Sequence, residues 1–217
     1  MKFRTKNAAF SLVELLTVVA IMSIMMGVIV SSGMGTRPAG SRQGAVSQLI
    51  GSLEEARMSA VERGVPVYFA VAGSDAPEQE KRLRSYLLFR EQTPDEKASS
   101  GSTNNISNGG PAVVLTRWES LPQGFYFDPA LLETVTTEVD VQSGLPSGIT
   151  KVRAMKFGSL GQLQGTVTTN APSLSVVSGV LDPASGTITP VGKSDFCVEI
   201  SRLTGRVRFD DTESANP

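Results

Sequence analysis

A single carboxylate, that of Glu14, lies inside an otherwise uncharged apolar run that extends from Leu12 to Val30. An ionised side chain at the centre of a membrane helix costs about 2.5–3.5 kcal/mol on insertion scales, so it calls for a partner. Cleavage between Ala9 and Phe10 would create an α-amino group four residues before Glu14. In a bundle of such helices, the carboxylate of one chain could then neutralise the amino terminus of its neighbour, with both charges away from water.

Few other residues of this chain have the chemistry of a catalytic or metal site. The absence of histidine removes Ser-His-Asp and Cys-His triads and every His-ligated metal site. The single cysteine, Cys197, excludes an internal disulfide, and its alternating neighbours favour a strand residue over a reactive thiol. A paired-carboxylate hydrolase stays open because such sites are assembled in space. No sequence feature favours one, so we expect that the protein is not an enzyme.

Acidic residues cluster near the C-terminus at Asp210, Asp211 and Glu213. Carboxylate oxygens are good ligands for calcium, but this cluster lacks the EF-hand pattern. A solvated acidic tail is therefore favoured and no cofactor is expected, with calcium near Asp210 and Asp211 as the alternative. The formal net charge of −1 shows no basic excess, so nucleic-acid binding is not expected.

The N-terminal segment has the dimensions of a membrane anchor. The 19 residues from Leu12 to Val30 would form a helix about 28 Å long, close to the roughly 30 Å hydrocarbon core of a bilayer. Lys2, Arg4 and Lys6 precede this run. Basic residues on one side of a span favour the cytoplasm, so the remainder of the chain is expected outside the inner membrane.

Three interpretations of this segment compete. A secretory signal peptide needs an apolar stretch of roughly 7–15 residues followed by a small-x-small site, whereas this run is longer and Ser31-Ser32-Gly33 offers only a weak site. A plain signal anchor leaves Glu14 unexplained. Cleavage after Ala9 followed by assembly of the exposed helix accounts for the carboxylate.

The stretch from Ala8 to Leu16, AAFSLVELL, closely resembles the prepilin processing and methylation motif of type IV pilins and type II secretion pseudopilins. The resemblance implies that a prepilin peptidase removes residues 1–9, that Phe10 is N-methylated, and that Glu14 takes part in subunit assembly. The family usually has glycine before the cut, where this chain has Ala9, so slower processing is one expectation. Removal of three basic residues with the leader takes the net charge from −1 to −4.

The chain beyond the leader divides into an anchor, a stem and a β-rich part. The apolar stripe after Arg42 predicts a helix that ends at Gly64, with Met58 and Val61 on its buried face. The predicted organisation is a leader at 1–9, a transmembrane and assembly helix at 10–30, a flexible or kinked stem at 31–41, an amphipathic helix half at 42–64, and an antiparallel β domain at 65–217 with a loop at 92–111.

Alternating apolar residues predict short strands throughout the β domain. Polar or glycine-containing turns separate them, so an antiparallel sheet and an α+β fold are expected, with a long N-terminal pilin-like helix packed on the sheet. The segment 128–148 is compatible with a short helix or a strand. The predicted strands are 65–71, 85–90, 112–118, 125–127, 150–157, 174–181, 187–191, 195–200 and 206–209.

A second, looser resemblance covers most of the chain. Its series of segments is similar to the GspH/FimT group of minor pseudopilins and pilins, in which two antiparallel sheets pack against the C-terminal half of the long helix. The series also resembles prepilin-type proteins known mainly from genome cassettes. The segments are Leu53–Ala60, Val65–Phe69, Trp118, Leu121–Gly124, Phe157–Gly161 and Leu203–Val207.

These features predict a non-catalytic filament subunit, in a minor, initiating or tip-proximal position of a pilus or secretion pseudopilus. Its partners would be other pilin or pseudopilin subunits, the prepilin peptidase and methyltransferase, and the inner-membrane assembly platform. It would reside in the inner membrane as a single-pass protein with a periplasmic domain before it enters a filament. The alternative is a membrane-tethered binding module with a passive anchor. DNA binding at a filament tip stays open, and an anchored enzyme is a third class.

Overall fold

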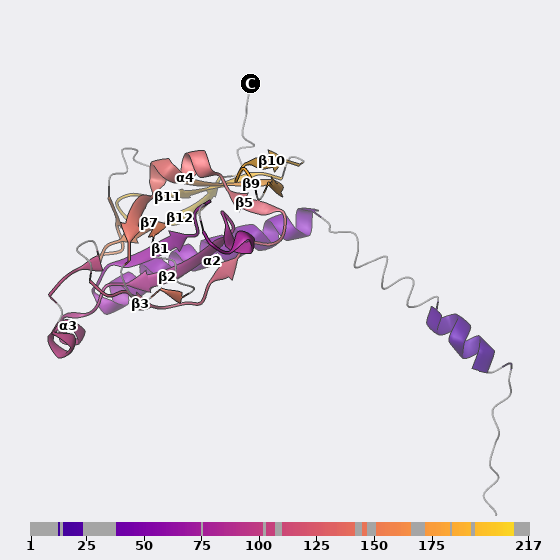
Figure 1. The fold of residues 1–217 in the computed structure, drawn as a ribbon, viewed down its shortest axis with the longest axis horizontal. Coiled ribbons are helices and arrows are strands. Elements are labelled where there is room, and N and C mark those ends of the chain that lie inside the picture. Colours follow the sequence, from indigo (N-terminus) through magenta and orange to yellow (C-terminus); the bar gives the residue numbers. More distant parts are fainter. Residues whose placement is uncertain are drawn as a thin grey trace, which may run out of the picture. The chain divides into compact units, whose positions relative to one another are not determined.

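The computed structural model describes residues 13, 15–23, 38–74, 76–101, 103–106, 110–141, 145–146, 151–165, 172–182, 184–191 and 194–210. The chain forms two compact units, residues 1–38 and residues 39–217. The larger unit combines helices with antiparallel sheets, which confirms the predicted α+β class (Figure 1).

The long helix α2 extends over Pro38–Arg63, so it begins four residues before the predicted start at Arg42. Pro38 is its first residue, where a fixed φ and a missing N–H do no harm. The helix ends one residue before Gly64, whose φ of 65° is a left-handed conformation that glycine adopts without strain. The buried face of α2 is a stripe of small and branched apolar side chains: Ala45, Val46, Leu49, Leu53, Ala56 and Ala60. The predicted stem at 31–41 therefore loses its last four residues to α2, and residues 31–37 lie outside the described residues.

Two residues that were predicted on this buried stripe, Met58 and Val61, are instead exposed. Successive residues of an α-helix are about 100° apart, so Met58 lies about 200° around the axis from both Ala56 and Ala60. Because these two alanines face the core, Met58 must point away from it. Val61 follows Ala60 by about 100° and lies outside the same narrow stripe.

A seven-stranded antiparallel sheet forms the first layer beside α2, with the order β3-β2-β1-β7-β6 and with β4 on β2 and β8 on β7. Its central strands are in register through Phe69, which lies opposite Leu88 of β2 and Met155 of β7. All residues of β1 and β2 are buried, because both faces of this sheet are covered. The strands are β1 Val67–Val71, β2 Ser85–Arg90, β3 Val113–Val114, β4 Glu119–Ser120, β6 Thr137–Asp140, β7 Lys151–Phe157 and β8 Leu163–Gln164.

A five-stranded antiparallel sheet forms the second layer, in the order β10-β9-β11-β12 with β5 paired to β9. Two hairpins build most of it, β9–β10 and β11–β12, as the turn residues of the sequence predicted. The strands are β5 Phe125–Phe127, β9 Ser173–Leu181, β10 Ile188–Pro190, β11 Phe196–Ile200 and β12 Val207–Asp210.

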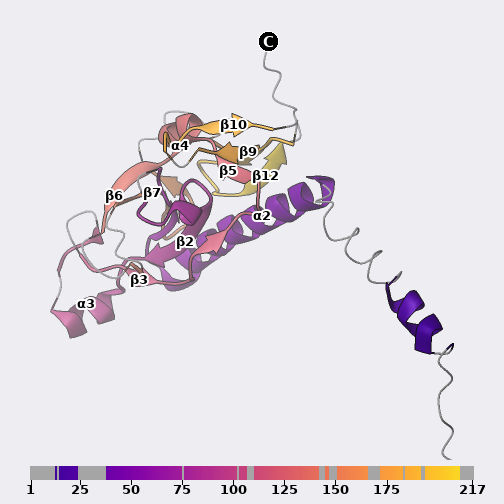
Figure 2. The ribbon, with the colours of Figure 1, turned by 45° about the vertical axis from the view of Figure 1, so that its right-hand side comes forward.

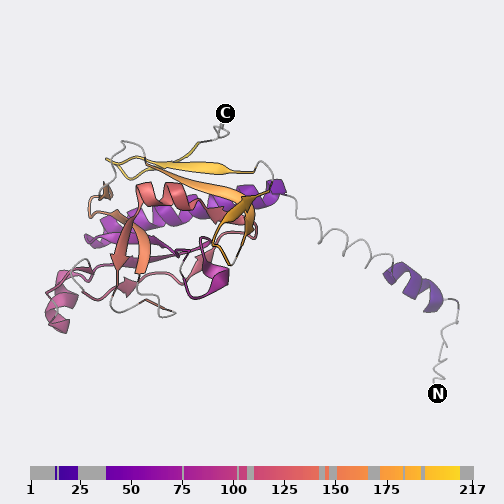
Figure 3. The same ribbon diagram turned by 45° about the horizontal axis from the view of Figure 1, so that its top comes forward.

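The main core joins α2 to both sheets, and Figures 2 and 3 show the helix lying along them. Leu53 of α2, Phe157 of β7 and Val198 of β11 are all fully buried in this one cluster. A second cluster covers the other face of the seven-stranded sheet, where Phe89 packs beneath Ile106 from the segment after β2. The connection between β2 and β3 is therefore held against the sheet by the apolar side chain of Ile106.

The prediction of a flexible loop at 92–111 is wrong in its first half. Helix α3, Pro94–Ser100, lies there, and it is nucleated by a capping box. The Thr93 hydroxyl accepts from the Glu96 backbone N–H at 3.3 Å, while the Glu96 carboxylate accepts from the Thr93 N–H at 2.8 Å. The signal was present in the sequence as Thr93-Pro94-Asp95-Glu96, but the polar composition around it favoured a loop.

The undecided segment 128–148 contains both a helix and a strand. Helix α4, Pro129–Val135, follows Asp128, whose carboxylate accepts from the Ala130 N–H at 3.0 Å. Strand β6 begins two residues after the helix ends and pairs with β7. Of the strand predicted at 112–118, only Val113 and Val114 form one, β3, and the next strand, β4, begins one residue after the predicted range ends.

Substitution of Gly205 by alanine is expected to destabilise the domain by at least about 2 kcal/mol. Gly205 has a φ of 62°, and a Cβ there would collide with the carbonyl oxygen of Gly161. Gly51→Ala is the matched control, because no atom lies within 4 Å of its Cβ position in α2. A gain of about 0.5–1 kcal/mol is expected there from helix propensity. Urea unfolding of both variants measures the change in the free energy of unfolding. A wild-type midpoint for Gly205→Ala would contradict the close packing of the turn at Gly205 against the turn at Gly161.

Candidate functional site

The predicted processing and assembly residues Ala9, Phe10 and Glu14 lie outside the described residues. Their roles therefore remain predictions. The structure describes the chain that follows them, which is helical over residues 15–23. This helical segment belongs to the first unit of the chain, separate from the core of the β domain.

The helical segment presents apolar side chains on all sides. Leu15, Leu16, Val18, Val19, Ile21 and Met22 are between 46% and 67% exposed. A helix that is apolar all round is typical of segments that become buried in lipid or among other helices. Within the described residues, no helix is both long enough and apolar enough to cross a membrane.

Two hydroxyl groups interrupt this apolar surface, and both bond within their own helix. Thr17 donates to the Val13 carbonyl oxygen at 2.9 Å, and Ser23 donates to that of Val19 at 2.8 Å. Such bonds to the residue four positions earlier satisfy the hydroxyl donor within the helix. The segment can therefore enter an apolar environment without exposing an unsatisfied hydroxyl donor.

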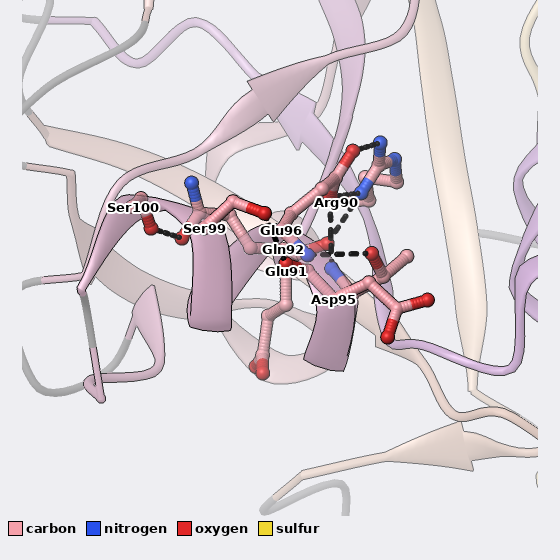
Figure 4. A network of polar contacts seen from close by, with 8 residues as sticks. Arg90, Glu91, Gln92, Asp95, Glu96, Ser99 and Ser100 are labelled. Atoms are coloured by element: carbon pink, nitrogen blue, oxygen red, sulfur yellow. Dashed lines mark hydrogen bonds and ion pairs between the residues drawn. The ribbon is translucent and has the colours of Figure 1, made fainter.

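A network of polar contacts lies at the junction of β2 and α3 (Figure 4). The guanidinium of Arg90 donates to both carboxylate oxygens of Glu96 at 2.6 Å, and Arg90 is itself only 5% exposed. The Arg90 hydrogen bonds, followed by the backbone bond from Thr93, lower the pKa of Glu96 to about 2. Glu96 thus closes the capping box and ties α3 to a buried arginine.

A second carboxylate beside this pair, that of Glu91, is buried against the outer face of the sheet. The Tyr68 hydroxyl donates to its Oε1 at 2.8 Å, and Lys156 Nζ lies 3.3 Å from the same atom. Burial, together with the bond to Glu91, raises the pKa of the Tyr68 hydroxyl far above its ordinary value. These groups link β1, β2 and β7. The contact between Lys156 and Glu91 could not be predicted from their spacing in the sequence.

A polar link also connects α2 to the seven-stranded sheet. Ser52 of α2 donates to the Tyr86 hydroxyl at 3.1 Å, and Tyr86 donates to the Glu119 carboxylate at 3.0 Å. Burial raises the pKa of Tyr86 to about 12, so it stays protonated and keeps this donor role at physiological pH. The arrangement fixes the rotation of α2 against the sheet.

A cavity of about 250 Å³ lies beneath α4, at the end of the seven-stranded sheet. Leu83 and Leu132 contribute apolar surface, and Arg153 contacts Glu133 of α4 at 2.8 Å at its rim. Leu83 has a φ of 52°, an unusual conformation for a branched side chain. Its volume is slightly below the roughly 300–1,000 Å³ of small-molecule sites, and its charged side chains are paired as Arg153–Glu133 and Lys151–Glu138.

Cys197 and Asp210 lie on neighbouring strands of the five-stranded sheet, directly opposite each other. Cys197 is half-buried in β11, as predicted, and burial raises the pKa of its thiol. Asp210 ends β12, whereas Asp211 and Glu213 lie outside the described residues. Within the described part of the chain, no group of three or more cysteine or acidic residues is placed to hold a metal ion. Calcium near Asp210 and Asp211 stays a prediction.

Replacing Glu96 by glutamine is expected to lower the melting temperature by a few degrees at pH 7. The folded-state pKa of about 2 lies below the ordinary value of 4.5, so ionised Glu96 stabilises the fold above about pH 4.5. This contribution is lost as the pH falls toward 2. Thermal unfolding measured from pH 7 to pH 2 should therefore show a shallower pH dependence for Glu96→Gln.

The control for this prediction is Asp95→Asn, which changes a carboxylate in the same helical turn and leaves Arg90 paired. It is expected to retain the wild-type pH dependence. Equal pH profiles for wild type and Glu96→Gln would show that the pair with Arg90 does not stabilise the domain.

Comparison with known proteins gives one match, and it lies at the N-terminus. Residues 4–30 match the family described as Prokaryotic N-terminal methylation motif. No curated protein matches the chain. No solved structure matches it either. The matched range includes Ala9, Phe10 and Glu14 together with the helical segment 15–23. The chain therefore carries a prepilin-type N-terminal methylation motif, which supports the type IV pilin-like character predicted from its sequence.

Proposed function

We propose that this protein is a non-catalytic structural subunit of a type IV pilus-like filament or a type II secretion pseudopilus. The observation that carries the proposal is the methylation motif at residues 4–30, which ends in an apolar segment and precedes a separately packed α+β domain. A prepilin peptidase would cut after Ala9, and Phe10 would then be N-methylated. Before assembly the protein is anchored in the inner membrane, with its domain on the periplasmic side.

Assembly follows from the chemistry of the N-terminal segment. The apolar side chains of residues 15–23 are exposed, and packing against equivalent helices would bury them. Helices that leave lipid gain van der Waals contacts and interhelical bonds rather than a large hydrophobic term. The pairing of Glu14 with the Phe10 amino group of a neighbour removes two unpaired charges, so it can decide the register between subunits.

We assign the subunit a minor position, either initiating or tip-proximal. This assignment rests on the resemblance of several segments to the GspH/FimT group, such as Leu53–Ala60 and Phe157–Gly161. Two antiparallel sheets packed along α2 agree with the arrangement expected from that resemblance. The subunit's partners would be other pilin-like subunits, the processing enzyme and an inner-membrane assembly platform.

The second candidate function is a membrane-tethered binding module, and the cavity beneath α4 is the observation that favours it. In that case the anchor is passive and the domain captures a ligand on its own. Deletion of residues 1–37 should then leave ligand affinity unchanged. A filament subunit, by contrast, loses its function with its anchor.

Mechanical shearing of cells tests the proposal. The processed protein is expected in the sheared filament fraction together with other chains that carry the same N-terminal motif. A protein that remains entirely in the membrane fraction while other pilin-like subunits are sheared off would favour the tethered module.

A further inference from the structure

Four large apolar side chains gather at the C-terminal end of α2, where they face solvent. Leu160 and Leu203 are 83% and 86% exposed, and Met58 and Val61 of α2 are 60% and 50% exposed. The turn that carries Leu160 lies against α2, since a Cβ added at Gly161 would lie 3.0 Å from Val61 Cγ2, and the turn that carries Leu203 lies against it, since a Cβ at Gly205 would collide with the Gly161 carbonyl oxygen. We call these four residues the α2-end patch.

The two leucines of the patch stand on well-ordered turns. Gly161 and Gly205 adopt positive φ values of 82° and 62°, which allow the turns to close against each other. The Gly205 N–H donates to the Ser201 carbonyl at 2.7 Å, and the Leu163 N–H donates to that of Arg202 at 2.9 Å. A fixed, exposed apolar cluster is typical of an interaction surface, because a monomer gains nothing by presenting it to water.

The charge around the patch indicates what kind of surface it fits. Arg202 and Arg206 flank Leu203 and are exposed, and Arg63 ends α2 beside Val61. On the helix side Glu55 and Glu62 are exposed, and Arg57 is paired with Glu54 at 2.9 Å, so the excess of positive charge lies on the Leu203 side of the patch. A complementary partner has an apolar face bordered by acidic side chains.

We propose that the α2-end patch docks the domain of a neighbouring pilin-like subunit, a chain with its own N-terminal methylation motif. This inference rests on the proposed function and adds a second contact to the one between N-terminal helices. Four side chains cover far less than the roughly 800 Å² per partner of a stable interface. The contact is therefore weak by itself and acts when the helices already hold the subunits together. Leu160 and Leu203 favour an apolar protein face as the partner. A phosphate backbone would gain neither a charge contact nor a hydrogen bond from two leucine side chains.

The test compares Leu160→Gln/Leu203→Gln with the matched variant Val180→Gln/Val191→Gln, which changes two valines that are 62% and 60% exposed on the β9–β10 hairpin. Each full-length variant is expressed in the native host in place of the wild type. The melting temperature and the mass of the mature chain are measured first, to check folding and cleavage after Ala9. The leucine variant is expected to be processed and folded, but reduced about tenfold in the sheared filament fraction, whereas the valine variant stays at the wild-type level.

A photocrosslinking amino acid at position 203 of the otherwise unchanged chain gives a second measurement that does not depend on the double variant folding. A crosslink to a chain with a methylation motif supports the proposal. Crosslinks only to lipid or nucleic acid would overturn it, as would a processed leucine variant that fills the filament fraction normally. A wild-type chain that keeps residues 1–9 and never reaches filaments would instead overturn the proposed function, and the docking site with it.

Discussion

Glu14→Gln is expected to leave cleavage after Ala9 intact and to remove the protein from filaments. Glutamine has the same size and lacks the charge, so the Phe10 amino group of a neighbouring subunit would lose its partner in an apolar environment. An unpaired charge of this kind costs about 2.5–3.5 kcal/mol, which corresponds to a decrease in incorporation on the order of 100-fold. Immunoblots of membrane and sheared fractions, combined with the mass of the mature chain, measure both steps.

Two control variants separate the charge from general damage to the helix. Glu14→Asp keeps the carboxylate and should retain much of the assembly. Ser23→Ala removes a hydroxyl that bonds within its own helix, so it should assemble normally. Normal filaments from Glu14→Gln would show that the carboxylate has no pairing role.

Leu53→Ala is expected to destabilise the larger unit by about 2–5 kcal/mol. Leu53 is fully buried where α2 meets both sheets, so truncation leaves a cavity that the sheets on either side cannot close. A loss of this size is a large part of the roughly 5–15 kcal/mol that stabilises a folded domain. Denaturant unfolding of the purified protein, followed by circular dichroism, measures it.

The matched control is Leu131→Ala on α4, which makes the same chemical change at a side chain that is 42% exposed. Its expected cost is below about 1 kcal/mol. Equal unfolding midpoints for the two variants would contradict the central position of α2 in the core.

The sequence predicted those elements whose signals are local. Strand β2 has the predicted bounds, Ser85–Arg90, because six strand-forming residues lie between polar turns. The β9–β10 and β11–β12 hairpins were also predicted, since their turns contain glycine or Asp-Pro. In each case the residues that decide the structure are neighbours along the chain.

The order of the strands in the sheets could not be predicted in the same way. Strand β1 pairs with β7, so Phe69 lies opposite Met155. Nothing in the local pattern of either strand encodes this partner, because many apolar strands of similar length would fit. Burial of both faces of β1 follows from that pairing and from the cover that Ile106 provides.

The functional residues also differ in whether local sequence identifies them. The processing and assembly residues form a compact motif, so Ala9, Phe10 and Glu14 could be identified directly from sequence. The α2-end patch could not, because it depends on two turns that bring Leu160 and Leu203 to the end of α2 where Val61 lies. Periodicity alone even placed Met58 in the core, where the structure shows it exposed.

The mass of the intact protein purified from its native membrane or filament shows whether residues 1–9 are removed and Phe10 is methylated. We expect a mature chain that begins at Phe10 and carries one additional methyl group on its amino terminus. A chain that still begins at Met1, in cells with an active prepilin peptidase, would contradict processing and leave the N-terminal segment as an ordinary anchor.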